Sequence, residues 1–233
     1  MSRLPREFQR LFLSTDAGSE PAAVAADAAV RALVLEVARP AQWSALSAVW
    51  QGVQADLQLP APAIAVNGVD GMQLWFSLQQ PVATARGHEF LEGLRRRYLA
   101  ELPSARIALM ALPRKLPALQ ADTGNWSAFV APDLAPIFDD APWLDIPPSE
   151  EGQADLLQRL KCIQPAAFDA ALQHLQPVAE APGLVAEAAA DAAPLPSPAA
   201  HHDARHFLLW VMNDTAAPLA LRIEAAKALL PYR

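Results

Sequence analysis

The segment Ala63–Leu78 constrains the fold of this chain more than any other stretch. Its sequence, AIAVNGVDGMQLWFSL, is two short β-rich runs joined by the turn Asn67–Gly71, in which two glycines can take positive φ. In the second run, apolar residues alternate with Gln73, Trp75 and Ser77, so the two sets lie on opposite faces of a strand. We predict a hairpin with one core face and one face that carries a large aromatic ring and polar groups.

Strand and helix patterns alternate around this hairpin. Arg31–Ala38 alternates as a strand does, and Gln42–Leu57 has apolar residues at steps of three and four, as in an amphipathic helix. After the hairpin, Thr84–Leu102 is a second such helix and Arg106–Leu112 a fourth strand. The order β-α-β-β-α-β predicts an α+β fold of the ferredoxin/RRM-like type, with both helices on one face of an antiparallel sheet and the other face open.

Two groups of residues are candidates for binding. Glu36, Gln73 and Trp75 would lie on the open face of the sheet, where Trp75 could stack a base as aromatic residues on RRM sheets do. The triplet Arg95, Arg96 and Arg97 is a candidate basic patch. Positive charge also suits the C-terminal half of a helix, so the triplet fits a solvated helix end as well as a phosphate-facing surface.

The rest of the chain divides by composition. We expect an N-terminal arm and Ala-rich segment at residues 1–30, the α+β core at 31–150, a helical hairpin at 151–180, an Ala/Pro-rich linker at 181–202 and a short helical tail at 203–233. Within the arm, Ser2–Leu13 fits either a short amphipathic helix or a loose solvated end. The core ends in a long Pro-rich loop, residues 113–148, in which Ser127–Ala131 could add an edge strand.

Composition excludes several classes of protein. Of the 233 residues, 53% are hydrophobic and 18% charged, so a packed core is expected. A net charge of −7 argues against nonspecific nucleic-acid binding, although it leaves a local basic groove open. The single cysteine, Cys162, rules out an internal disulfide and favours a reducing cytoplasm. No uncharged apolar run is long enough to cross a membrane, so no membrane span is predicted.

No complete catalytic or metal-binding motif occurs. Nucleotide-binding glycine loops, the G-x-S-x-G elbow and the H-E-x-x-H motif are all missing. His202 and His206 could share a helix face, but no third ligand with compelling spacing follows, although Asp203 is adjacent. The acidic residues Asp139, Asp140 and Asp145 fit solvated loop carboxylates better than a metal site. We therefore predict no catalytic residues, no metal and no cofactor, which favours a protein that is not an enzyme.

The core resembles the catalytic half of the archaeo-eukaryotic primase superfamily over residues 31–112. Leu33–Val37 corresponds to the strand that carries an acidic pair in that family, and Asn67–Phe76 to its glycine-histidine hairpin. Only Glu36 remains of the acidic pair, and Gln73 stands where the family has histidine. Two-metal nucleotidyl transfer needs several carboxylates, so the resemblance implies a degenerate, non-polymerising member that handles nucleotides or nucleic acid.

The tail, Phe207–Arg233, resembles a helical segment of phage terminase small subunits. The residues that carry this similarity are Met212–Asp214, Pro218, Leu221–Ile223, Ala225–Ala228 and Leu230–Tyr232. The resemblance implies a docking element of phage or mobile-element type. Its apolar side chains would bury against a protein partner or in a small self-packed helical pair; they are Leu208, Val211, Leu221, Ile223 and Leu229.

These observations support two functional hypotheses, and they leave open a third interpretation, a bacterial-type soluble domain whose open sheet face is covered by the Pro-rich loop at residues 113–148. The first is a non-enzymatic binding or assembly protein, which uses an open sheet face and a tail held at high effective concentration by the flexible linker. The second is a degenerate primase-like protein that binds nucleotide or nucleic acid at Glu36, Gln73 and Trp75, and the acidic net charge weighs against it.

Overall fold

The computed structural model describes residues 3–13, 29–111 and 115–176. All of these residues lie in the first of the two units into which the chain divides, Met1–Glu180 and Ala181–Arg233. The predicted linker at 181–202 and the predicted tail at 203–233, with all five of its docking residues, therefore lie outside the described residues.

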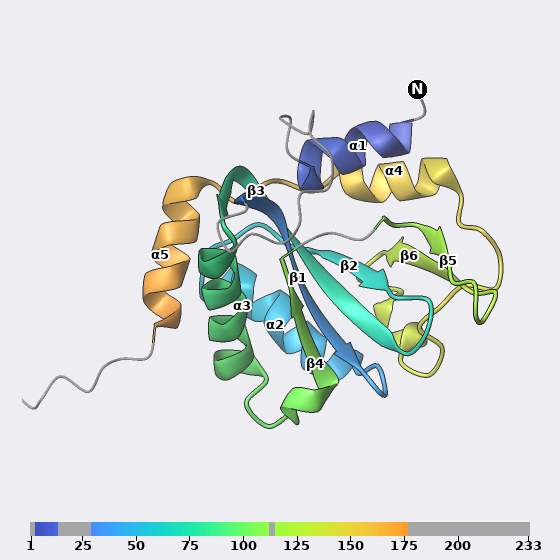
Figure 1. Cartoon of the computed structure of the whole chain (residues 1–233), viewed down its shortest axis with the longest axis horizontal. Helices are drawn as coiled ribbons and strands as arrows, with labels where there is room; N and C mark the ends of the chain where they lie inside the picture. The colour runs from blue at the N-terminus through green and yellow to red at the C-terminus, as the bar shows by residue number, and fades with distance from the viewer. Residues whose placement is uncertain (1–2, 14–28, 112–114, 177–233) are drawn as a thin grey trace, which may run out of the picture. The chain divides into compact units, whose positions relative to one another are not determined.

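The described residues form an antiparallel sheet of six strands flanked by helices (Figure 1). The strand order is β4-β1-β3-β2-β6-β5. The strands are β1 (Ala29–Ala38), β2 (Ala63–Val66), β3 (Gly71–Ala83), β4 (Ile107–Met110), β5 (Ala118–Leu119) and β6 (Trp126–Val130). The predicted α+β class is confirmed. A strand is present where an edge strand was expected at Ser127–Ala131: it is β6, paired with β2 from Ile64↔Val130 to Val66↔Ala128. The edge position itself is taken by β5, which pairs with the other side of β6.

The predicted hairpin is formed by β2 and β3, with Ile64 opposite Leu74 and Val66 opposite Met72. Its turn is built by Asn67, whose Oδ1 accepts hydrogen bonds from the backbone N–H groups of Val69, Asp70 and Gly71 at 2.8–3.0 Å. Gly68 has φ +84°, and a Cβ there would lie 2.9 Å from the backbone nitrogen of Ser127 in β6. Glycine is therefore needed at this position for both the backbone conformation and the close approach of β6.

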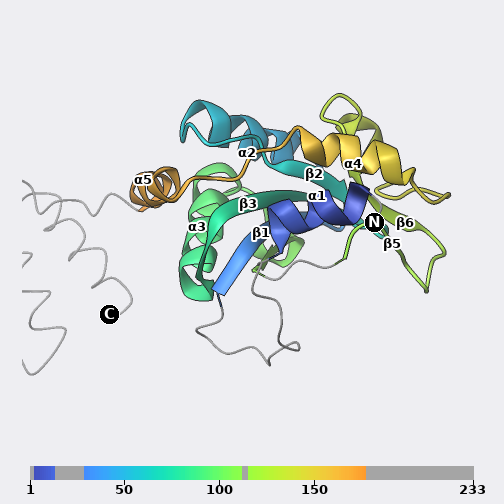
Figure 2. The same ribbon diagram turned by 90° about the horizontal axis from the view of Figure 1, so that it is seen from above.

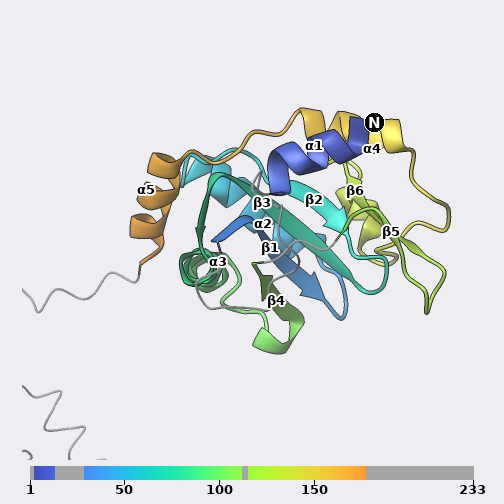
Figure 3. The same cartoon turned by 45° about the horizontal axis from the view of Figure 1, so that its top comes forward.

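Helices cover both faces of the sheet (Figures 2 and 3). One face carries α2 (Trp43–Ala55), α3 (Thr84–Tyr98) and α5 (Pro165–Leu175), which pack on inward residues of the central strands such as Leu33, Leu35, Leu74 and Phe76. The other face carries α1 (Arg3–Phe12) and α4 (Glu150–Gln158), which lie side by side (Figure 1). Two short 3₁₀ helices, η1 (Ser104–Arg106) and η2 (Ala135–Phe138), complete the described elements.

The second face of the sheet is a core of its own. Leu4, Leu11 and Phe12 of α1 and Ala154 and Leu157 of α4 are buried there against the sheet residues Ala32, Val34, Ala63, Ala65, Trp75 and Phe129. The prediction of an open face is therefore wrong at the centre of the sheet. Of the two alternatives for Ser2–Leu13, the structure has the amphipathic helix, because its apolar side finds a partner surface.

The predicted helical hairpin at 151–180 is also wrong. Helix α4 packs against α1 and β6, whereas α5 packs against α3 on the opposite face of the sheet. The segment that joins them crosses the end of the sheet at Ile163. Its N–H donates to Ser77 O at 2.7 Å and its carbonyl accepts from Gln79 N at 2.9 Å. Ile163 therefore pairs with β3 at Leu78. This position lies past the start of β2, whose first residue, Ala63, is opposite Trp75.

Two helical glycines form a matched pair that tests the packing of α5 on α3. A Cβ added at Gly93 in α3 would lie 2.7 Å from Cβ of Leu175 in α5, whereas at Gly152 in α4 the nearest atom is 3.7 Å away. Because the Cβ of Leu175 cannot rotate aside, we expect Gly93→Ala to lower the free energy of unfolding by about 1–3 kcal/mol. Gly152→Ala should be neutral or stabilising by up to about 1 kcal/mol. Urea unfolding followed by circular dichroism measures both, and equal changes would contradict the close contact.

Candidate binding surface

The structure brings the three predicted open-face residues together. Trp75 Nε1 donates a hydrogen bond to Gln73 Oε1 at 2.8 Å, and Gln73 Nε2 donates to a carboxylate oxygen of Glu36. Glu36 lies directly opposite Gln73 in the β1–β3 register. Asn67 Nδ2 lies 3.4 Å from the other oxygen of Glu36 and 3.2 Å from Asp70 Oδ1. The polar groups of this cluster therefore bind one another.

Two of these three residues are buried, which contradicts their assignment to an open face. Trp75 is 2% exposed and Gln73 5%, whereas Glu36 is half-buried. The Trp75 ring meets Phe8, Phe12 and Phe129 edge-on, with ring centroids 6.0, 5.2 and 5.5 Å away. A base has no access to a ring enclosed in this way. The spacing of Phe8 and Phe12, four residues apart on α1, was the sequence signal for a helix with both rings on one side.

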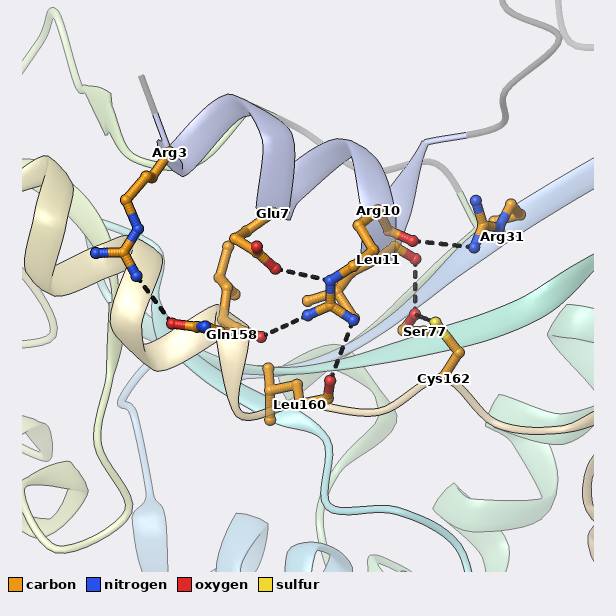
Figure 4. A network of polar contacts seen from close by, with 10 residues as sticks. Arg3, Glu7, Arg10, Leu11, Arg31, Ser77, Gln158, Leu160 and Cys162 are labelled. Atoms are coloured by element: carbon orange, nitrogen blue, oxygen red, sulfur yellow. Dashed lines mark hydrogen bonds and ion pairs between the residues drawn. The ribbon is translucent and has the colours of Figure 1, made fainter. Parts of the chain in front are cut away.

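Polar contacts hold α1 over this face (Figure 4). The Arg10 guanidinium donates to the carbonyls of Leu157 and Leu160 at the C-terminal end of α4, at 3.0 and 3.3 Å. Arg31 of β1 donates to the carbonyls of Arg10 and Leu13 at the end of α1, at 3.1 and 2.7 Å. In both cases a cation binds carbonyls near the C-terminal end of a helix, where it also interacts favourably with the helix dipole.

Two further contacts fasten the ends of α1. Ser77 Oγ donates to the carbonyl of Leu11 at 2.6 Å and also lies 3.0 Å from the sulfur of Cys162 (Figure 4). At the other end, Arg3 forms an exposed ion pair with Asp155 at 2.9 Å. The N-terminal arginines Arg3 and Arg10 are therefore used in binding α1 to α4.

The candidate basic patch on α3 is largely neutralised by neighbouring carboxylates. Arg95 pairs with Glu92 at 2.5 Å, and this hydrogen bond lowers the pKa of Glu92 and raises the pKa of Arg95. Arg97 pairs with Asp56 at 3.2 Å, and Arg96 Nε lies 3.4 Å from the carbonyl of Glu92. This geometry fits a solvated helix end better than a phosphate site.

Asp56 also ties α3 to α2 through Tyr98. The Tyr98 hydroxyl donates to Asp56 at 2.9 Å, and the Arg97 guanidinium lies 5.5 Å from the centre of the Tyr98 ring. Burial, followed by the hydrogen bond to Asp56, raises the pKa of Tyr98 to about 12. Asp56 thus links the C-terminal end of α2 to α3.

A groove that no sequence pattern indicated lies beside α1. Its volume is about 650 Å³, within the range of ligand pockets. Most of its walls are apolar, with Lys115 and Glu150 as the charged groups. The lining comes from segments far apart in sequence: Leu4, Pro5, Phe8 and Leu13; Lys115, Leu116 and Pro117; Trp126; Pro147, Pro148 and Glu150. We call this the α1–β6 groove.

Within residues 3–13, 29–111 and 115–176, no group of three or more metal-ligating side chains converges. Asp139, a member of the acidic loop cluster, accepts a hydrogen bond from the backbone N–H of Trp43 at the start of α2. Its carboxylate therefore caps a helix, which is a structural use of an acid at that end. Among the same residues, no helix combines the length and apolarity that crossing a bilayer would need.

No protein-family model matches the chain, and no curated protein matches it significantly.

Proposed function

We propose that the core has a ferredoxin/RRM-like fold, enlarged by β6 and β5 and covered on its second face by α1 and α4. The order β1-α2-β2-β3-α3-β4 supports this proposal, since it is the element order of that fold. The first four strands of the sheet, β4-β1-β3-β2, are then the original sheet, and the additions lie outside β2.

For the whole chain, we propose a non-enzymatic binding or assembly function, with the α1–β6 groove as the binding surface of the body. The observation that carries this proposal is the contrast between the two candidate sites. The polar side chains of the sheet face hydrogen-bond one another, whereas the groove, about 650 Å³ in volume, presents a mostly apolar surface to solvent. Apolar grooves lined by aromatic and proline residues suit apolar side chains of a protein partner.

The tail supplies the second contact in this proposal. Its apolar residues Leu208, Val211, Leu221, Ile223 and Leu229 would bind the same partner, and the Ala/Pro-rich composition of 181–202 would act as a tether. Two weak contacts joined by a tether bind more tightly together than either does alone. A reducing cytoplasm remains our expected location, because the chain has one cysteine.

Site-specific photo-crosslinking in cells tests this function. A photoreactive residue at Trp126 in the groove and one at Leu221 in the tail should crosslink the same protein, and one at Arg96 on α3 should not. The crosslinked protein, once purified, should bind the full-length chain. Its affinity should fall at least tenfold with Trp126→Ala but not with Trp143→Ala, a second half-buried tryptophan that does not line the groove.

Two results would overturn the proposal. One is that Trp126 and Leu221 crosslink nothing beyond the background seen at Arg96. The other is that the purified partner binds wild type and Trp126→Ala equally. Metal-dependent binding of a nucleotide that Trp75→Phe weakens would support the primase-like alternative instead, although the burial of Trp75 weighs against it.

A further inference from the structure

The walls of the α1–β6 groove offer few main-chain hydrogen-bond donors. Four of the residues that line it are prolines, Pro5, Pro117, Pro147 and Pro148, and proline has no backbone N–H. A partner segment that binds as an added β-strand needs both donors and acceptors along the edge that receives it. The walls of this groove cannot supply such a ladder, which argues against a partner strand.

One side-chain donor in the groove has no acceptor among the described residues. It is the indole N–H of Trp126, whose ring is half-buried. By contrast, the indole N–H of Trp75, in the core, donates to Gln73 Oε1. A ligand that covered the Trp126 donor without pairing it would lose free energy, because a buried N–H needs an acceptor. The groove therefore favours a ligand with an unpaired carbonyl.

A polyproline II segment meets these conditions better than a helix does. Its carbonyls make no internal hydrogen bonds, whereas the carbonyls in the middle of a helix are already paired within the helix. Its prolines have no N–H groups that would lack an acceptor in an apolar groove. Such segments dock into grooves lined by aromatic rings, and both Phe8 and Trp126 line this one.

The two charged residues of the groove define a further feature of the ligand. Lys115 and Glu150 are exposed, and neither forms an ion pair or a side-chain hydrogen bond with another described residue. An acidic residue of the ligand would complement Lys115, and a basic residue would complement Glu150. Exposed charges add little affinity, but they distinguish one proline-rich segment from another.

We propose that the α1–β6 groove binds a proline-rich segment of the partner protein in the polyproline II conformation. The indole N–H of Trp126 donates to a carbonyl of this segment, and its proline rings contact Phe8 and Trp126. An acidic and a basic residue of the segment lie beside Lys115 and Glu150. The inference rests on the proposed binding function and adds the chemistry of the partner element that the groove recognises.

Peptide binding to the full-length chain tests this inference. The probes are two fluorescein-labelled peptides in which a run of eight prolines lies between an aspartate and a lysine, in either order. A glycine-serine peptide of the same length and charges is the control, because it is a flexible coil. Fluorescence anisotropy should show saturable binding of at least one proline peptide and at least tenfold weaker binding of the glycine-serine peptide.

Two kinds of substitution assign this binding to the groove. Trp126→Phe keeps a ring and removes the donor, so it should weaken binding of the proline peptide about fivefold. Trp143→Phe, outside the groove, should leave the affinity unchanged. Lys115→Gln and Glu150→Gln should each weaken binding about twofold, and neither should affect a proline peptide without the two charged residues.

The inference would be overturned if neither proline peptide bound more tightly than the glycine-serine peptide. Equal affinities of Trp126→Phe and Trp143→Phe would also overturn it. If circular dichroism showed that Trp126→Phe does not fold, the two charge variants would decide, and wild-type affinity of both would overturn the inference.

The outcomes also separate this inference from the proposed function. If Trp126 and Leu221 crosslink one partner but no proline peptide binds, the groove is a binding surface for another kind of segment. If the proline peptides bind as expected but the crosslinks fail, the groove recognises such segments and the tail does not act with it.

Discussion

Replacing Trp75 with alanine should lower the free energy of unfolding by about 3–5 kcal/mol, the usual cost of deleting a large buried ring. The Trp75 side chain is the shared contact of Phe8, Phe12 and Phe129, and it is 2% exposed. Its removal would leave a cavity between the sheet and α1, and it would also deprive Gln73 Oε1 of its donor. Equilibrium unfolding in urea, followed by circular dichroism, measures the loss.

Trp126→Ala is the matched control for this prediction. Trp126 is half-buried at the groove, so its replacement should cost clearly less than that of Trp75. If Trp75→Ala cost no more than Trp126→Ala, the second face of the sheet would not be a core. The interpretation of Trp75 as an exposed stacking residue would then regain its physical basis.

Replacing Gln153 with leucine should lower the free energy of unfolding by about 2–4 kcal/mol, since it leaves two buried backbone groups without partners. The Gln153 amide binds both polar groups of one residue in β6. Its Oε1 accepts from Phe129 N and its Nε2 donates to Phe129 O, each at 2.8 Å. Leucine keeps much of the side-chain volume and provides neither hydrogen bond.

Gln158→Leu on the same helix is the control, because Gln158 binds the exposed Arg3 guanidinium. It should change the free energy of unfolding by less than about 0.5 kcal/mol. Urea unfolding compares the two variants directly. A change for Gln153→Leu as small as that for Gln158→Leu would mean that water replaces the amide at the edge of β6.

The elements of the core could be predicted because their signals are local. The Asn67–Gly71 turn, the alternation in β3 and the apolar spacing of α2 and α3 each depend on neighbouring residues, and the structure has all of them. The β2–β3 register also follows from the turn. In these segments, local preference and tertiary packing favour the same structure.

The cover of the second face could not be predicted from the same signals. An amphipathic pattern shows that a helix has an apolar side, but not which surface that side meets. Helices α4 and α5 have similar patterns and short spacing, which suggested a hairpin, yet Leu157 of α4 and Phe168 of α5 belong to cores on opposite faces. The link through Ile163, which places them there, rests on backbone hydrogen bonds that no side-chain pattern encodes.

The candidate site shows the same difference between what local patterns predict and what long-range packing decides. The sequence correctly placed Glu36, Gln73 and Trp75 on one face, since strand alternation requires it. The burial of Trp75 depends on Phe8, Phe12 and Phe129, which lie far from it in the chain. The α1–β6 groove was missed altogether, because no two of its main walls are adjacent in sequence.

The hydrogen bonds of the Gln153 amide also affect the tendency of the protein to associate at high concentration. Strand β5 begins at Ala118, opposite Ser127, so the outer edge of β6 at Phe129 lacks a neighbouring strand, and the Gln153 side chain occupies the position that a strand would take. Unoccupied edges of this kind recruit strands from other molecules, which is how many folded proteins begin to aggregate. Gln153 thus closes this stretch of the β6 edge, and we expect its loss to leave the N–H and C=O of Phe129 open to pairing with a strand of another molecule at high concentration.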